Sequence, residues 1–390
     1  MKRIETVTSV LFLTILFGFS VLFCLAPDRS FSEQENRSLQ KAPVVSVKNL
    51  FSGQLSRDVN RYFSDQFPLR DLWVGIKGCL ELAGGKGENN GILLGEHGQL
   101  ARRKFAVLRA DGTVVADCDA YDPAHLEKAW QGINRAAEGL DVPFSVLLTG
   151  RNIDIAASAL DYPSDFSDAL LSEMENRLSP SVQAISTVKL LREKFDNGEA
   201  VYYKTDHHWT TSGAYYGYVE TMKAFGMTDQ VIPMDQFEKR TASTSFYGTL
   251  WSAGGMKWVE PDEVQFWLAG NEDSFRIVAD GKELDGFYNE EWLARKDHYS
   301  AFLDGTHDVV TVRRRDGAER PTLLILKDSF ANSIAPFLSQ HFDLVLLNLS
   351  STRQDFTNVS ELAREYGADR VMLIYTLENV ITADKLCRLK

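Results

Sequence analysis

The pattern of hydrophobic and polar residues starts with a long apolar run near the N-terminus. Val7 to Ala26 contains twenty residues without a charge. At ~1.5 Å per residue it is long enough to cross a hydrocarbon layer of ~30 Å. We expect residues 7–26 to be a single-pass anchor in the cell membrane. Because Lys2 and Arg3 precede the run, we expect residues 1–6 in the cytoplasm and the C-terminal domain outside it.

A cleaved signal peptide is the alternative for this run. Cys24-Leu25-Ala26 has the small-x-small pattern of a cleavage site, although Pro27 disfavours processing. Polar residues then continue to about Val47, as in an exposed tether. Helical periodicity over 50–63 and 69–82 follows. We therefore assign 27–88 to a tether and helical lead-in and 89–390 to a globular domain.

The C-terminal third alternates apolar strand-like runs with amphipathic segments. Helices and strands in alternation favour a parallel, doubly wound α/β sheet. An earlier helix is expected over 126–140, capped by Asp122, and another over 213–225, capped by Thr210 or Thr211. The expected strands are 144–148, 322–326, 344–349 and 371–375, and the later helices are 331–338 and 360–366.

Composition narrows the function classes. The chain has 44% hydrophobic and 25% charged residues, which indicates a globular protein, and its net charge of −12 opposes general nucleic-acid binding. The basic run Arg313 to Arg315 adjoins Asp316-Gly317 and is expected at a solvated hairpin end. Outside the apolar run, Cys79, Cys118 and Cys387 contain no CxxC pair, so neither a zinc site nor a disulfide scaffold is supported.

The candidate chemistry lies in two separated segments. In Thr205-Asp-His-His-Trp-Thr210, Asp206 can orient His208 as a general base, and alternation along an extended turn would put His207 on the other side. Ser329 follows an apolar strand and is the candidate nucleophile. Backbone N–H groups around Ser329 and the Asn332 side chain are candidate oxyanion donors. Together they predict a Ser-His-Asp hydrolase or acyltransferase.

Each of these residues has another interpretation. Ser329 could cap a helix, and Asp206, His207 and His208 could bind a metal, although no further ligand is evident. Asp328 could form a turn, which we prefer, or replace Asp206. Trp209 is expected to pack in the core. The stretch 246–255 could bind sugar through Tyr247, Trp251 and Gly254, or be an ordinary loop with partly buried aromatic rings.

These motifs, taken in order, resemble the DHHW protein family, and that family is similar to the SGNH-hydrolase-like alginate O-acetyltransferases of the bacterial envelope. The resemblance is spread along most of the chain and begins with the anchor. Its pieces are Phe31-Ser32-Glu33, Glu35-Asn36-Arg37-Ser38-Leu39, Asp65-Gln66-Phe67-Pro68-Leu69-Arg70-Asp71, Asn89-Asn90-Gly91, Asp206-His207-His208-Trp209 and Lys327-Asp328-Ser329-Phe330.

The resemblance implies a three-layer SGNH-like α/β domain in circularly permuted order, with Asp206, His208 and Ser329 as its triad. It also implies transfer of acetyl groups to a cell-envelope polysaccharide, with a membrane-bound O-acyltransferase as the partner that supplies acetyl. Lys327 departs from the glycine that usually precedes Asp-Ser. We expect no cofactor. An acetylesterase and a non-catalytic glycan-binding or scaffolding protein are the alternatives.

Overall fold

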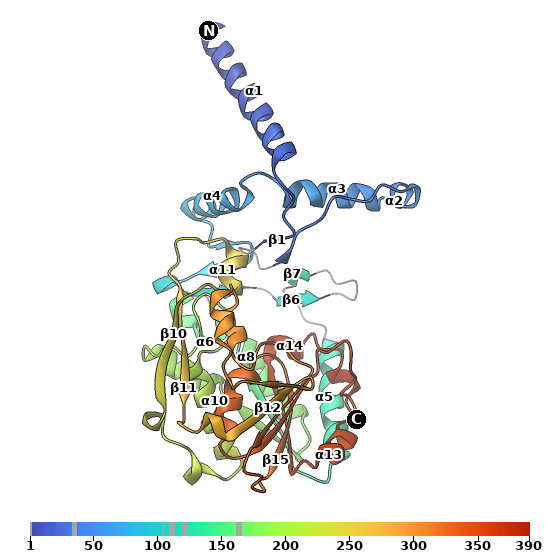
Figure 1. Cartoon of the computed structure of the whole chain (residues 1–390), viewed down its shortest axis with the longest axis vertical. Coiled ribbons are helices and arrows are strands. Elements are labelled where there is room, and N and C mark those ends of the chain that lie inside the picture. The colour runs from blue at the N-terminus through green and yellow to red at the C-terminus, as the bar shows by residue number, and fades with distance from the viewer. Residues whose placement is uncertain (1, 33–36, 104, 109–113, 119–122, 161–165) are drawn as a thin grey trace. The chain divides into compact units, whose positions relative to one another are not determined.

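The computed structural model describes residues 2–32, 37–103, 105–108, 114–118, 123–160 and 166–390 (Figure 1). Tertiary contacts divide the chain into two compact units. One contains Met1–Asn90 and Ser252–Trp258, and the other contains Gly91–Trp251 and Val259–Lys390. Glu33, Glu35 and Asn36 of the family motif and the expected cap Asp122 lie outside the described residues.

The first unit is mainly helical. Its helix α1 is long and apolar enough, over Ile4–Leu25, to cross a membrane. The helix expected over 50–63 is in fact two helices, because Gly53 adopts the left-handed conformation (φ +70°) between them. The elements are α1 Lys2–Leu25, β1 Phe31–Ser32, β2 Arg37–Ser38, α2 Val47–Phe51, α3 Gln54–Asp65, α4 Arg70–Ala83 and β3 Glu88–Asn89.

The second unit is built on an eight-stranded sheet. Five neighbouring strands are parallel, in the order β16-β15-β17-β8-β9. The central strand β15 is buried on both faces, which explains its unbroken apolar run. The sheet, from edge to edge, consists of β13 Lys282–Leu284, β12 Phe275–Ala279, β14 Val309–Arg314, β16 Asp343–Asn348, β15 Thr322–Lys327, β17 Arg370–Thr376, β8 Phe144–Thr149 and β9 Val182–Ser186.

Three strands at one edge extend this sheet in antiparallel fashion, which the alternation in the sequence did not predict. β14 pairs with β12 and β16, while β15 lies between β16 and β17. The segment after β14 is therefore a crossover, and the prediction of a hairpin end at Arg313 to Arg315 was wrong. Two of these arginines form ion pairs, Arg314 with Asp316 at 2.9 Å and Arg315 with Glu283 at 2.9 Å.

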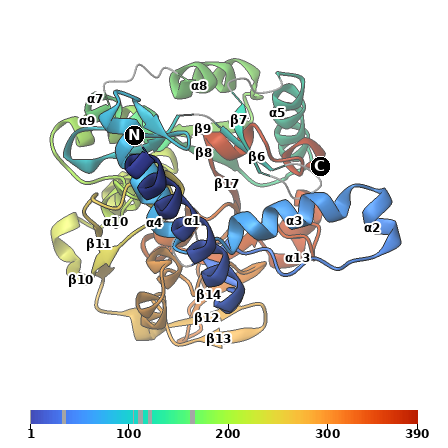
Figure 2. The same ribbon diagram turned by 90° about the horizontal axis from the view of Figure 1, so that it is seen from above.

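Helices cover both faces of the sheet. The β15 to β16 connection runs toward one edge and the β16 to β17 connection runs back, so right-handed crossovers put α12 and α13 on opposite faces. Figure 2 shows α5 and α13 to the right of the strands β8, β9 and β17 and α10 to their left, and α10 contacts α12. The bounds are α5 Pro123–Glu138, α10 Thr211–Ala224, α12 Ala331–Leu338 and α13 Val359–Tyr366. The three layers predicted from the sequence are thus present.

The remaining elements connect and border this core. A two-stranded ribbon of β10 and β11 lies between α10 and β12 in the chain and carries the glycine-rich stretch in its connection. These elements are β4 Ile92–Leu94, β5 Leu100–Arg102, β6 Phe105–Leu108, β7 Val114–Cys118, α6 Asn152–Ile155, α7 Ala157–Leu160, α8 Phe166–Arg177, α9 Val188–Asp196, β10 Glu238–Phe246, α11 Thr249–Gly254, β11 Asp262–Leu268 and α14 Leu377–Val380.

Candidate active site

A tight loop holds Asp206 and His208. Tyr202 and Trp209 form an antiparallel bridge, and the Tyr203 N–H donates to the His208 carbonyl at 3.1 Å, so residues 204–208 close a hairpin. The buried Asp262 carboxylate accepts hydrogen bonds from the backbone N–H groups of Lys204 at 3.0 Å and Thr205 at 2.8 Å. Asp262 therefore holds the loop in place although it lies outside the segment Thr205 to Thr210.

Ser329 lies just past the carboxyl end of β15, and Asp328 fixes its turn. The Asp328 carboxylate accepts hydrogen bonds from the Phe330 N–H at 3.0 Å, the Thr376 N–H at 2.8 Å and Asn379 Nδ2 at 2.9 Å. Thr376 ends the neighbouring parallel strand β17. Asp328 therefore has the turn-forming role that we preferred for it, and it ties the serine turn to the adjacent strand.

The structure brings together Ser329, His208 and Asp206. His208 Nε2 lies 2.7 Å from Ser329 Oγ, and His208 Nδ1 lies 2.6 Å from Asp206 Oδ1. Because an ionised carboxylate only accepts hydrogen bonds, His208 Nδ1–H donates to Asp206 and Nε2 is left to accept from the serine hydroxyl. This is the geometry of a Ser-His-Asp triad.

The Asp206 carboxylate has partners on both oxygens. Asp206 Oδ1 accepts from the His208 backbone N–H at 3.0 Å as well as from the His208 ring, and Oδ2 accepts from the Thr249 N–H at 2.8 Å and the Thr249 hydroxyl at 2.9 Å. Burial raises the pKa of Asp206, but the electrostatic interactions and hydrogen bonds with His207 and His208 outweigh it and hold that pKa well below its usual range. Asp206 is thus a stable anion.

Gly248 is required beside this carboxylate. A Cβ atom at position 248 would lie 2.2 Å from the Asp206 Cβ and 2.5 Å from Oδ2. The glycine-rich stretch therefore contributes to the site through Gly248 and Thr249, by close backbone approach and hydrogen bonds to Asp206. The sequence marked this stretch as a candidate, but the residues predicted to act in it were Tyr247, Trp251 and Gly254.

His208 is packed between aromatic rings. Tyr299 stacks on it with ring centroids 3.6 Å apart and planes 8° apart, and the Tyr299 hydroxyl donates to the Ser329 carbonyl at 3.0 Å. Burial and the charge of His207 lower the pKa of His208, against the raising effect of Asp206. A neutral His208 is the form that can accept the serine proton. No local sequence signal pointed to Tyr299.

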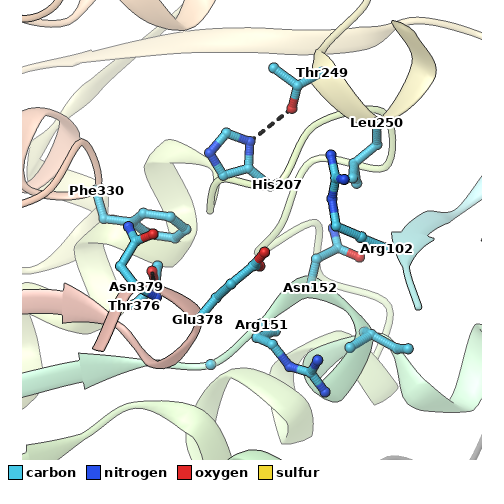
Figure 3. Close-up of a pocket in the computed structure, with 12 residues that line it drawn as sticks. Arg102, Arg151, Asn152, His207, Thr249, Leu250, Phe330, Thr376, Glu378 and Asn379 are labelled. Atoms are coloured by element: carbon cyan, nitrogen blue, oxygen red, sulfur yellow. Dashed lines mark hydrogen bonds between the residues drawn. The ribbon is translucent and has the colours of Figure 1, made fainter. Parts of the chain in front are cut away.

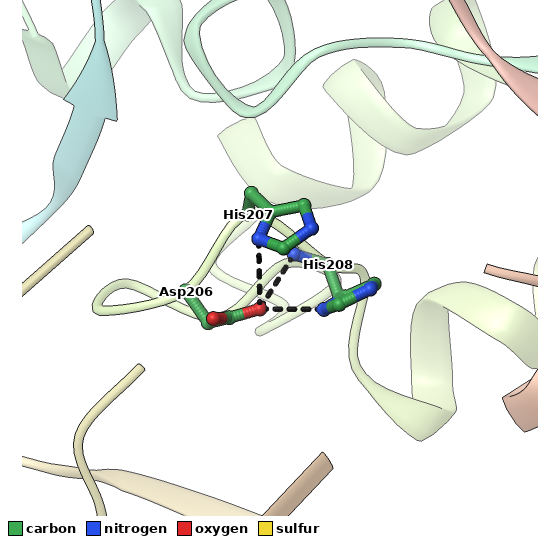
Figure 4. Close-up of side chains that lie close together, drawn as sticks. All are labelled: Asp206, His207 and His208. Atoms are coloured by element: carbon green, nitrogen blue, oxygen red, sulfur yellow. Dashed lines mark hydrogen bonds and ion pairs between the residues drawn. The ribbon is translucent and has the colours of Figure 1, made fainter. Parts of the chain in front are cut away.

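His207 lies beside His208 and not on the opposite side. The two ring centroids are 3.9 Å apart (Figure 4). The predicted alternation was wrong because residues 204–208 form a bent loop, not an extended segment. Since the Thr249 hydroxyl donates to Asp206, His207 Nδ1 must donate to Thr249 Oγ1, 2.8 Å away. Burial lowers the pKa of His207, but Asp206 raises it more, so the net shift is upward.

A cavity of about 290 Å³ adjoins the loop on the His207 side (Figure 3). It is formed by residues that follow the adjacent strands β8, β15 and β17 at their carboxyl ends, where open α/β sheets bind ligands. Figure 3 shows the Glu378 side chain extending into it below His207. Its lining consists of Arg102, Gly150, Arg151, Asn152, Ile153, His207, Thr249, Leu250, Phe330, Thr376, Glu378 and Asn379.

The residues predicted to bind sugar do not line this cavity. Tyr247 and Trp251 are half-buried and contact each other, with ring centroids 4.6 Å apart. Gly254 belongs to the other compact unit, where its carbonyl accepts a hydrogen bond from Asn89. From the same stretch, Thr249 and Leu250 line the cavity instead. The aromatic rings face one another because the chain turns into α11 at this point.

Asn332 and Trp209 have structural contacts. Asn332 Nδ2 donates to the Gly305 carbonyl at 2.9 Å, and its Oδ1 accepts from the buried Lys327 Nζ at 2.8 Å, so the geometry favours a packing role over oxyanion binding. Burial lowers the pKa of Lys327 to about 8. Trp209 is fully buried and donates to Ser333 Oγ at 2.8 Å, which confirms the packing role predicted for it.

The same three side chains are the candidate metal ligands. The potential ligand atoms of Asp206, His207 and His208 all lie within 4.8 Å of one another. Two ligands bound to one tetrahedral zinc ion at about 2.0–2.1 Å would be separated by about 3.3 Å. The 2.6 Å between His208 Nδ1 and Asp206 Oδ1 is the length of a charge-assisted hydrogen bond. The geometry favours the triad.

Two solved structures share this fold at low identity, and a third is a weaker match. A DHHW family protein from Eubacterium siraeum is 18% identical, with 77% of this chain and 96% of that chain covered and a TM-score of 0.56. Bacillus cereus PatB1 with a sulfonyl adduct is 19% identical, with 77% and 98% covered and a TM-score of 0.61. The O-acetyltransferase domain of Pseudomonas putida AlgJ is 12% identical, with 75% of this chain and 92% of that chain covered and a TM-score of 0.45. No curated protein matches the chain.

The fold of the second unit is thus an SGNH-hydrolase-like α/β fold, with Asp206 and His208 before Ser329 in the chain. The DHHW protein family model matches residues 153–348, half of the chain. The chain belongs to the DHHW family.

Proposed function

We propose that this protein is a membrane-anchored, extracytoplasmic O-acetyltransferase or acetylesterase that acts on a cell-envelope polysaccharide. The observation that carries the proposal is the unbroken set of contacts from Ser329 Oγ through His208 to Asp206, at 2.7 and 2.6 Å. The candidate membrane-spanning helix α1 supports the anchor. A membrane-bound O-acyltransferase is the proposed source of acetyl groups.

In the proposed reaction, Ser329 Oγ attacks the acetyl carbonyl of the donor while its proton passes to His208 Nε2. Asp206 stabilises the imidazolium that results, and the backbone N–H of Ser329 is the proposed oxyanion donor. The departing oxygen takes the proton from His208, which leaves acetyl-Ser329. A sugar hydroxyl, or water in an esterase, then attacks this ester and loses its proton to His208. His208 passes a proton to Ser329 Oγ as the ester bond breaks, and the acetylated sugar, or acetate, is released.

The cavity beside His207 is the proposed binding site for the polysaccharide. Its lining offers guanidinium donors from Arg102, a carboxylate acceptor from Glu378 and the ring of Phe330. Such a mixture of donors, acceptors and an apolar surface suits a sugar ring, which has hydroxyl groups at its edge and C–H groups on its faces. This assignment replaces the earlier one, which used Tyr247, Trp251 and Gly254.

The decisive test removes the nucleophile. Ser329→Ala should fold normally and lose about 10⁴-fold or more of the turnover of an acetyl ester and of glycan O-acetylation. The control is Ser245→Ala, at an exposed serine on β10. Phenylmethylsulfonyl fluoride should add one sulfonyl group to the wild type at Ser329, as seen by peptide mass spectrometry, and none to the alanine variant.

Three outcomes would overturn the proposal. Unchanged turnover and acetylation in Ser329→Ala would exclude the serine mechanism. Glycan binding by the wild type without sulfonylation of Ser329 or acetyl transfer would indicate a non-catalytic glycan-binding or scaffolding protein. A stoichiometric transition metal in the purified protein, essential for activity, would support the metal-dependent alternative.

A further inference from the structure

Helix α4 in the first unit carries its large apolar side chains on its outer face. Leu72, Trp73, Ile76 and Leu80 are all exposed, and the exposed fraction of Leu80 reaches 68%. Their spacing places them on one stripe of the helix. In a helix of a soluble protein, a stripe of this kind normally faces the core.

The inner face of α4 is occupied by glycine instead. Gly75 and Gly78 are buried, and an added Cβ at Gly78 would lie 2.7 Å from Asn89 Nδ2. At Gly75 it would lie 3.3 Å from the Lys257 side chain. The polar neighbours of α4 therefore pack closely against its backbone, and each of the large apolar side chains on the outer face stays at least 39% exposed.

The exposed apolar surface continues beyond α4. The segment before α2, helix α2 itself, the end of α3 and the α3–α4 connection all present large apolar side chains to the outside, and Phe51 has an exposed fraction of 84%. The side chains are those of Val44, Val45, Val47, Leu50, Phe51, Phe63, Phe67 and Leu69. Apolar patches larger than a few hundred Å² are rare on monomeric soluble proteins and mark interaction surfaces.

Contacts with α1 indicate what covers this surface. Phe19 stacks on Phe67 with centroids 5.5 Å apart and contacts Trp73 at 5.8 Å, and Phe23 stacks on Phe63 at 4.8 Å. Phe19 lies six residues before Leu25, the end of the candidate span, which is about 9 Å along a helix. Helices in the membrane interface bury their apolar face by about 5–10 Å, and aromatic residues are enriched there.

We propose that α2, α3 and α4 form a collar around the outer end of α1 that lies in the lipid interface of the membrane. The collar consists of residues 44–83. Its ligand is the lipid headgroup and upper acyl-chain region, and the stripe of Leu72, Trp73, Ile76 and Leu80 contacts these lipids. This inference rests on the proposed anchoring of α1. It adds a second attachment, which holds the base of the first unit against the bilayer instead of leaving it as a free tether.

The test uses the full chain reconstituted in phosphatidylethanolamine and phosphatidylglycerol vesicles. The native cysteines Cys24, Cys79, Cys118 and Cys387 are replaced by serine, and one cysteine is introduced for the environment-sensitive fluorophore NBD. Ile76→Cys reports on the stripe. Glu81→Cys is the matched control, because it is a partly exposed position on the other side of the same helix.

We expect a blue shift of NBD emission at position 76 and a loss of intensity with lipids that carry a nitroxide near the glycerol end of the acyl chain. The Glu81→Cys probe should show neither effect. Equal, water-like emission at both positions would overturn the collar, and so would a blue-shifted probe at 76 that lipid nitroxides do not quench, since a protein surface would then cover it.

Carbonate extraction separates failure of the collar from failure of the anchor. A chain that stays with the vesicles but shows water-like emission at position 76 overturns the collar alone. A chain that carbonate releases overturns both the anchor and the collar. Because the two labelled variants differ only at an exposed and a partly exposed position of one helix, near-identical circular dichroism should show that both retain the fold.

Discussion

The Ser329 turn and the Asp206 loop meet at one hydrogen bond but are stabilised in different ways. The turn follows a buried parallel strand, and Asp328 ties it to Thr376 at the end of the neighbouring strand. The loop depends on side chains from elsewhere in the chain, namely Asp262, Thr249 and Asn152, whose Nδ2 donates to the Asp206 carbonyl at 3.2 Å. Sheet topology thus fixes Ser329, the proposed nucleophile, and long-range polar contacts fix His208, the proposed base.

This difference predicts that the loop is the more vulnerable half of the site. Changes that leave the sheet intact should still disturb Asp206 and His208, because the atoms that hold them belong to other loops. Changes in the surface of the sheet should leave the Ser329 turn unaffected. The following substitutions test that contrast.

Asp206→Asn should have the largest effect of the loop substitutions. An amide in place of the carboxylate removes the charge that stabilises the imidazolium and favours the wrong tautomer of His208, so kcat should fall about 10⁴-fold. Turnover of an acetyl ester measures this, with circular dichroism as a check on folding. Asp316→Asn, at an exposed carboxylate after β14, is the control. Wild-type turnover in Asp206→Asn would exclude Asp206 as the orienting acid.

Gly248→Ala tests the close approach that the loop requires. The added methyl would overlap the Asp206 side chain, and a displacement of about 1 Å at a catalytic group costs on the order of 10²-fold in rate. Overpacking should also lower the free energy of unfolding by about 1–3 kcal/mol. Gly286→Ala, where the methyl would enter open space, should change neither quantity. Equal activity in both variants would show that the loop adjusts freely.

Asp262→Asn tests the buried carboxylate that anchors the loop. Burial raises the pKa of Asp262 to about 6. A raised pKa means that the folded state binds the proton more tightly than the unfolded chain, so this group's stabilisation is full below pH ~4 and is lost as pH rises through ~6. The contribution of Asp262 to the free energy of unfolding should change by about 3 kcal/mol at most over this pH range.

Urea unfolding of the wild type and of Asp262→Asn at pH 4, 5, 6 and 7 measures this contribution. The difference in the free energy of unfolding between the two proteins should change with pH across that range and level off above it. A difference that is constant with pH would mean that Asp262 titrates as it does in the unfolded chain. Loss of activity without loss of global stability would confirm that the loop, and not the core, depends on Asp262.

Of these substitutions His207→Asn should have the smallest effect. It should shift the pH profile of activity. The charge of His207 lowers the pKa of His208, so removing it should raise that pKa. The acidic limb of kcat/KM, where His208 becomes neutral, should then move to higher pH, with little loss at the plateau. Asn also keeps a donor near Thr249. An unshifted limb would show that His207 is neutral over the working range.

The sequence was sufficient to predict the half of the site that depends on the sheet, namely the position of Ser329. β15, α12 and β17 occupy almost the predicted residues, because unbroken apolar runs and helical periodicity report burial directly. Ser329 could therefore be assigned to a strand end. The antiparallel strands β12 to β14 were not predicted, since pairing partners are not encoded in local alternation.

The loop half required the tertiary structure. Asp206 and His208 were identified from their spacing, but His207 was assigned to the wrong side because the five-residue loop is bent by contacts with Asp262 and Thr249. Asp262 and Tyr299 carry no local signal of function. The glycine-rich stretch was a visible signal, and only the 2.2 Å approach at Gly248 shows why it is rich in glycine.

By itself the sequence determined the apolar span, the alternation of strands and helices, and the residue types of the triad, because these follow from hydrophobic period and from the chemistry of single side chains. The tertiary structure alone decided that Ser329 Oγ lies 2.7 Å from His208, that Thr249 and Tyr299 hold the triad, and that α4 turns its apolar stripe outward. These contacts join residues about 40 to 120 positions apart, and only packing of the folded chain sets such distances.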